Sequence, residues 1–166
     1  SEGSSAIGLH LGDDVDGGVV VGGRLLQGER GSVGAFAHLA VDVEGRPCVC
    51  GKSGCLDSYA SVRGIEATTG RGLVSTPSSL ITQSGMMVAR ACASLAAMMD
   101  IQRFRIGGVV VEAFRETFIE SIRDELVERT RLTHLKHLDV SVAQLHVLAG
   151  ASAVALAADS ARLDSA

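Results

Sequence analysis

The sequence lacks several features that would place it in particular classes of protein. It has no apolar run as long as a membrane span, and its first residues show no signal-peptide pattern. It has no run of lysine and arginine, and its net charge is −4, so the chain shows no nucleic-acid-binding surface of its own. These absences favour a cytoplasmic protein with no membrane partner.

Cysteine is also scarce, and it is unevenly placed. The chain has only 4 cysteines, whereas secreted disulfide scaffolds usually spread many along the sequence. Cys48, Cys50 and Cys55 fall within one short Gly-rich stretch, and Cys92 lies in an apolar helical pattern. One tight cluster and one buried thiol indicate an intracellular, metal-binding protein.

What is present suffices for one ordinary domain with its own core. The chain has 166 residues, of which 46% are hydrophobic and 20% charged. It opens with SEGSSAIGLHLG, enters a predicted strand almost at once and has no initiator methionine. We therefore expect it to be part of a longer protein.

Hydrophobic periodicity predicts an α/β fold. Alternation predicts a strand over 4–12, and two short β-runs around a Gly-Gly pair predict a hairpin over 18–28. The predicted order β-β-β-α-α-β-α-β-α favours a mixed β-sheet covered by helices. The remaining predicted elements are helices at 55–67, from Leu80 onward, at 113–130 and at 146–161, and strands near 104–111 and 137–142.

The cysteine cluster and a nearby histidine form a complete ligand set for a metal ion. Zinc favours four tetrahedral Cys or His ligands, and a structural site uses all four. The C-x-C-x4-C spacing is not that of the usual finger, and small thiols packed under a loop are the alternative. We expect zinc, because the loop is too polar and Gly-rich to bury three free thiols. The predicted zinc loop is 38–55, with ligands His38, Cys48, Cys50 and Cys55 and with Gly45, Gly51 and Gly54 expected to supply positive-φ turns.

The stretch GSVGAFAHLAVDVEGRPCVCGKSGCLDSYAS resembles the signature of the ROK family (repressors, uncharacterised reading frames and sugar kinases). The family pattern is approximately G-x-x-G-E-x-G-H-x-x-V, a short Gly turn, then C-x-C-G-x-x-G-C-L-E-x-x-x-S. MMDIQRFRIGG is similar to the family's strand-entry segment, and LAGASAVALA to its closing helix. The resemblance implies that 1–166 is the C-terminal lobe of a two-lobed, ribonuclease H-like, actin-like ATPase fold.

The resemblance also implies roles for the residues of the loop. His38 would bind a structural Zn²⁺ with the three cysteines and would also face the sugar. Asp57 stands where the family has the Glu after the last cysteine, which would keep a sugar-binding carboxylate on a shorter arm. One expected sugar contact is lost, because Ala35 replaces a Glu that accepts hydrogen bonds from sugar hydroxyls; the change from Gly to Ala37 is milder.

The phosphate side departs further from the family pattern. The kinases have a G-T-G-I-G-x-G turn there, whose backbone N–H groups bind ATP phosphates. This chain has GDDVDGG instead, and its carboxylates would repel the phosphates. The repulsion between one pair of like charges ~4 Å apart costs on the order of 1 to 4 kcal/mol. An exposed acidic hairpin turn is the preferred interpretation, with a divalent-ion site as the rival. The expected degenerate phosphate turn comprises Gly12, Asp13, Asp14, Asp16, Gly17 and Gly18.

Two functions follow from the resemblance. The preferred one is the effector-binding lobe of a sugar-responsive transcriptional regulator without kinase activity. Such a protein would bind a sugar or sugar phosphate, would bind DNA through an N-terminal domain outside this chain, and would form a homodimer or homotetramer. The alternative is an ATP-dependent sugar kinase whose general-base Asp lies on the other lobe. A degenerate sugar-binding protein with neither activity is a weaker third option.

Overall fold

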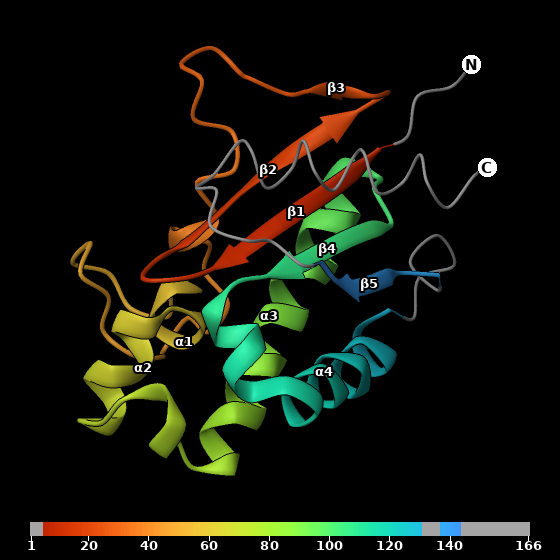
Figure 1. Cartoon of the computed structure of the whole chain (residues 1–166). Coiled ribbons are helices and arrows are strands. Elements are labelled where there is room, and N and C mark those ends of the chain that lie inside the picture. Colours follow the sequence, from red (N-terminus) through yellow and green to blue (C-terminus); the bar gives the residue numbers. More distant parts are fainter. Residues whose placement is uncertain (1–4, 131–136, 144–166) are drawn as a thin grey trace.

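The computed structural model describes residues 5–130 and 137–143 of the chain. Strands come first, helices follow, and two further strands alternate with the last described helix (Figure 1). In chain order the elements are β1 (Ala6–Leu11), β2 (Val15–Val21), β3 (Arg24–Leu25), η1 (Phe36–His38), α1 (Asp57–Ala60), α2 (Val62–Thr69), η2 (Leu73–Ser75), α3 (Ser78–Met99), β4 (Arg103–Gly107), α4 (Val109–Arg129) and β5 (Asp139–Val142).

The strands form one mixed sheet of five strands in the order β3-β2-β1-β4-β5. β1, β2 and β3 pair antiparallel, whereas β4 pairs parallel with both β1 and β5. Helices α3 and α4 lie side by side on one face of this sheet (Figure 1). The mixed, helix-covered sheet predicted from the order of elements is therefore confirmed.

The core lies between the sheet and these two helices. Ile7, Leu9 and Leu11 alternate along β1 and are fully buried, as expected for one face of a strand. The register places Phe104 and Ile106 of β4 beside the first two, so these side chains share one face. The helix face predicted within 113–130 is buried against the core at Phe114, Phe118, Ile122 and Leu126, with Ile119 partly buried.

Two details differ from the sequence-based expectations. The helix expected over 55–67 is two helices, because Ser61 has extended backbone (φ −99, ψ 157) and caps α2 by accepting a hydrogen bond from the Gly64 N–H. The last described helix begins at Val109 rather than at 113, directly after the Gly-Gly turn. The predicted Ala-rich helix over 146–161 lies outside the described residues.

Helix α4 is interrupted at Arg115, which has φ 47 and ψ −127 inside an otherwise helical segment. A non-glycine residue in such a region carries about 1–3 kcal/mol of strain. Arg115→Gly should therefore raise the free energy of unfolding by about 1 kcal/mol, after the entropic cost of glycine is subtracted. Urea unfolding beside Arg115→Ala, which keeps the strain, checks this; equal stability of the two variants would contradict it.

Candidate functional site

The four predicted metal ligands come together in the folded chain. Each offers one ligand atom, and these atoms all lie within 4.8 Å of one another. Nδ1 of His38 is 3.5 Å from Sγ of Cys48, and Sγ of Cys50 is 3.7 Å from Sγ of Cys55. A tetrahedral zinc ion would hold two sulfurs about 3.8 Å apart and a sulfur and a nitrogen about 3.6 Å apart. The donor set and its spacing therefore fit zinc.

The backbone of the loop turns tightly to bring these ligands together. Antiparallel bridges join Ala40 to Cys55 and Pro47 to Ser53. The positive-φ turns predicted at two glycines are present, with φ 85 at Gly51 and φ 74 at Gly54. Gly45 has no positive φ; it is needed because an added Cβ would lie 2.2 Å from the Tyr59 hydroxyl.

The ligands differ in their exposure to solvent. His38 and Cys50 are exposed, whereas Cys55 is buried, and burial raises the pKa of the Cys55 thiol to about 12. A bound cation would offset the cost of the buried thiolate, because a metal favours the deprotonated ligand. Cys92 has no such role, since it is fully buried in α3 and burial raises its pKa to about 12 as well.

The turn that carries His38 is packed directly against β2. A Cβ added to Gly34 would lie 2.0 Å from the carbonyl oxygen of Gly17, and a Cβ on Gly17 would lie 2.8 Å from the Phe36 ring. Ala35, where the family pattern has Glu, is exposed at the start of this turn. The predicted sugar side and the predicted phosphate side are therefore joined through glycine backbone.

Asp57, the second predicted sugar contact, is buried at the start of α1 with both carboxylate oxygens in use. Oδ1 accepts a hydrogen bond from the Val15 N–H at 3.0 Å, and Oδ2 accepts one from Arg63 at 3.0 Å. The carboxylate thus attaches the β1–β2 hairpin to the helices behind the metal loop. A direct contact between Asp57 and a sugar stays a prediction.

The stretch predicted as one degenerate phosphate turn is only partly a turn. Val15 already pairs with Leu11, so the turn between β1 and β2 consists only of Gly12, Asp13 and Asp14. The other predicted residues, Asp16, Gly17 and Gly18, belong to β2. Asp13 and Asp14 are exposed, whereas Oδ1 of Asp16 accepts a hydrogen bond from the next N–H. The divalent-ion interpretation of these carboxylates stays a prediction.

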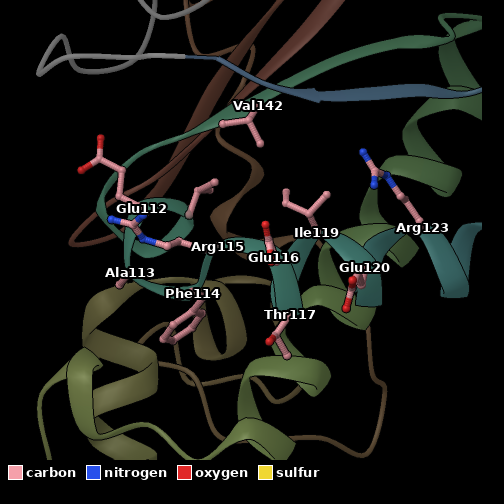
Figure 2. Close-up of a pocket in the computed structure, with 11 residues that line it drawn as sticks. Glu112, Ala113, Phe114, Arg115, Glu116, Thr117, Ile119, Glu120, Arg123 and Val142 are labelled. Carbon is pink, nitrogen blue, oxygen red and sulfur yellow. The ribbon is translucent and has the colours of Figure 1, made fainter.

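The Gly107–Gly108 turn lies beside this acidic turn. A Cβ added to Gly108, whose φ is 110, would lie 2.5 Å from the carbonyl oxygen of Leu11, so the two backbones are in direct contact. A separate open pocket of about 1160 Å³ lies along the interrupted helix α4, lined by residues between Val111 and Arg123 and by Val142. Figure 2 shows the pocket between α4, with Arg115 and Ile119, and Val142 of β5.

Sequence analysis missed the residues that support the metal loop. Arg46 and Tyr59 contact each other and the loop backbone, and Arg63 pairs with Asp57. The sequence held one weak signal: Tyr59 is the chain's 1 tyrosine, and it closely follows the last cysteine of the cluster. An arginine or a tyrosine at these positions does not by itself indicate that it supports a metal loop.

The fold and the loop together define the class: an α/β lobe of the ribonuclease H-like, actin-like ATPase fold with a cluster that could hold a metal ion. The sequence model of the ROK family matches residues 2–159, so the chain belongs to the ROK family. This confirms the resemblance drawn from the cysteine loop.

Curated and solved relatives show which members of the ROK family the chain is similar to. It is 32% identical over 136 residues to an N-acetylmannosamine kinase of Salmonella typhi, an alignment covering 73% of this chain and 46% of that protein. The chain thus spans about half the length of the curated relatives it matches. A ROK hexokinase from Thermus thermophilus superposes with a TM-score of 0.71 at 29% identity, covering 97% of this chain and 59% of that one.

A ROK family transcriptional regulator, a homolog of the E. coli MLC protein, also superposes, with a TM-score of 0.75 at 22% identity, covering 94% of this chain and 46% of that one. Identity this low shows a shared fold alone. Since the curated relatives above and the ROK hexokinase are kinases by name, the preferred interpretation as a non-enzymatic transcriptional regulator was wrong. The missing Glu and the acidic turn were given too much weight.

Within residues 5–130 and 137–143, every helix is too short or too polar to cross a lipid bilayer.

Proposed function

We propose that residues 1–166 are the C-terminal lobe of an ATP-dependent sugar kinase of the ROK family. The observation that carries the proposal is the 32% identity over 136 residues to a curated N-acetylmannosamine kinase. The 29% identity to the ROK hexokinase, over 97% of this chain, supports it. The substrates are then a hexose or an N-acetylhexosamine and ATP. Assembly into a homodimer or homotetramer stays a prediction.

The metal loop would order the sugar side of the site. His38, Cys48, Cys50 and Cys55 would hold a structural zinc ion, whose full protein shell leaves no position for a catalytic water. Nδ1 of His38 faces Cys48, so a metal on Nδ1 leaves the proton on Nε2. The imidazole would then donate a hydrogen bond from Nε2 to a sugar oxygen, with its orientation set by the loop.

The nucleotide would occupy the region between the acidic turn and α4. The acidic turn and the Gly107–Gly108 turn, whose backbones are in direct contact, would lie near the phosphates. The open pocket along α4 would take the base and ribose. The resemblance to the family implies that the general-base Asp comes from the other lobe, outside these residues, and deprotonates the attacking sugar hydroxyl.

The proposal is tested by ADP release from ATP in the full-length protein that contains this chain. N-acetylmannosamine, N-acetylglucosamine, glucose and mannose are offered separately, with a sugar-free sample as the control. We expect sugar-dependent ADP release with at least one of them. A protein that releases no ADP with any sugar and binds no non-hydrolysable ATP analogue would not be a kinase.

The acidic turn leads to a second prediction about the nucleotide. Replacing both Asp13 and Asp14 by Asn removes two exposed carboxylates from the expected phosphate side. Solvent screens these charges, so we expect the lower end of the Coulomb range and a Kd for MgATP reduced about tenfold. Titration calorimetry measures it, with Asp100→Asn, which removes one carboxylate at the opposite end of the sheet, as the control. An unchanged Kd would mean that phosphate lies elsewhere.

A further inference from the structure

Beyond the metal ligands, one side chain ties the metal loop to two helices. Arg46 stands two residues before Cys48, and its Cζ lies 4.5 Å from the centroid of the Tyr59 ring. Nη1 of Arg46 donates a hydrogen bond to the carbonyl oxygen of Ser58 in α1 at 3.2 Å. Nη2 donates to Oε1 of Gln83 in α3. The guanidinium thus uses its planar fork to join the loop to elements that are distant in sequence.

Tyr59 completes this contact from α1. Its hydroxyl accepts a hydrogen bond from the backbone N–H of Arg46 at 3.0 Å and donates one to Oδ2 of Asp42 at 2.9 Å. The side chain is 1% exposed, and burial raises the pKa of the phenol, so the hydroxyl keeps its proton. The missing side chain at Gly45 leaves the space that this hydroxyl fills.

The contact extends into the backbone that carries the ligands. Oγ of Ser58 donates to the carbonyl oxygen of Pro47 at 3.1 Å, and the N–H of Gly54 donates to the carbonyl oxygen of Arg46 at 2.8 Å. Pro47 is also bridged to Ser53 across the loop. None of these bonds uses a metal-ligand atom, so they can hold the loop with or without an ion.

We propose that Arg46 and Tyr59 form a latch that preorganises the metal loop, which makes Arg46 a positioning residue for the metal. Ordering a flexible loop costs conformational entropy, and a loop already held in its bound shape avoids that cost when the ion binds. Through His38 the same latch sets the imidazole that would face the sugar. The inference rests on the metal binding proposed above and is independent of phosphoryl transfer.

The test compares three variants of the full-length protein by zinc affinity, from competition with a chromophoric chelator, and by amide hydrogen exchange of the metal-free form. Arg46→Met should weaken zinc binding about tenfold to a hundredfold, the range for residues that support a metal ligand. It should also speed exchange at the amides of Cys48 and Gly54. Arg46→Lys should recover part of both effects, because an ammonium can still lie over the ring and donate one bond.

Arg105→Met is the matched control. Arg105 is also largely buried, with its side chain 12% exposed, and pairs with Asp139 on the far strands of the sheet. Its loss should lower the midpoint of unfolding without changing zinc affinity. Arg46→Met with wild-type zinc affinity and wild-type exchange would contradict the latch, even if the variant melts earlier. If the wild type binds no metal, the metal proposal fails, and amide exchange in the metal-free protein alone decides the latch.

Discussion

Gly54→Ala is expected to abolish metal binding by the loop. A Cβ at this position would lie 1.5 Å from the carbonyl oxygen of Asp42, and φ is 74 there. The Gly54 carbonyl also accepts hydrogen bonds from the N–H groups of Val41 and Asp42, so the two segments cannot separate without losing both. Steric overlap and left-handed strain together should cost about 3 kcal/mol or more. Zinc content by atomic absorption and the midpoint of thermal unfolding measure the effect.

Gly51→Ala is the matched comparison within the same loop. Gly51 also has a positive φ of 85, but a Cβ added there meets nothing within 4 Å. Only the left-handed strain remains, at about 1–2 kcal/mol, so this variant should still bind zinc at full stoichiometry. If Gly51→Ala and Gly54→Ala lose similar amounts of zinc, the close approach of Gly54 to Asp42 is not the reason that position 54 requires glycine.

Cys50→Ser is expected to lower zinc content and thermal stability together. Loss of a residue that only supports a ligand typically costs about 10–100-fold in metal affinity, so loss of a ligand itself should cost at least about a hundredfold. Because a structural metal contributes directly to folding, the same change should lower the midpoint of unfolding. Chelator treatment of the wild type should lower the midpoint similarly and should have little further effect on the variant.

Cys92→Ala controls for the loss of a thiol elsewhere. Cys92 is fully buried in α3 and is not one of the clustered ligands. Its replacement should destabilise the protein through the space left in the core while zinc stoichiometry stays at that of the wild type. Cys50→Ser with an unchanged metal content would contradict the four-ligand assignment.

The errors in functional interpretation came from treating single departures as decisive. Ala35 and the acidic Asp13–Asp14 turn argued against a kinase when each was weighed against the family pattern. Similarity along 136 residues points the other way, because it draws on most of the chain rather than on two positions. In the proposed kinase, the loss of one sugar contact at Ala35 would change specificity more readily than reaction class.

The fold class and the four residues that could hold a metal ion were predictable from the sequence alone. Strand alternation in β1 and the helical spacing from Phe114 to Leu126 depend on local periodicity, which is legible without a structure. The candidate ligand set was equally predictable, because three of the chain's 4 cysteines lie close together in sequence and His38 precedes them closely.

The support of that loop could not be predicted from the sequence, because it depends on contacts between distant parts of the folded chain. Gln83 of α3 contacts Arg46 in the loop, and the Val15 N–H binds Asp57 across 42 positions of the chain. The length of the acidic turn likewise depended on the register that pairs Leu11 with Val15. Such contacts join residues that are distant in sequence, and no local pattern specifies them, because they form only when the helices close over the sheet.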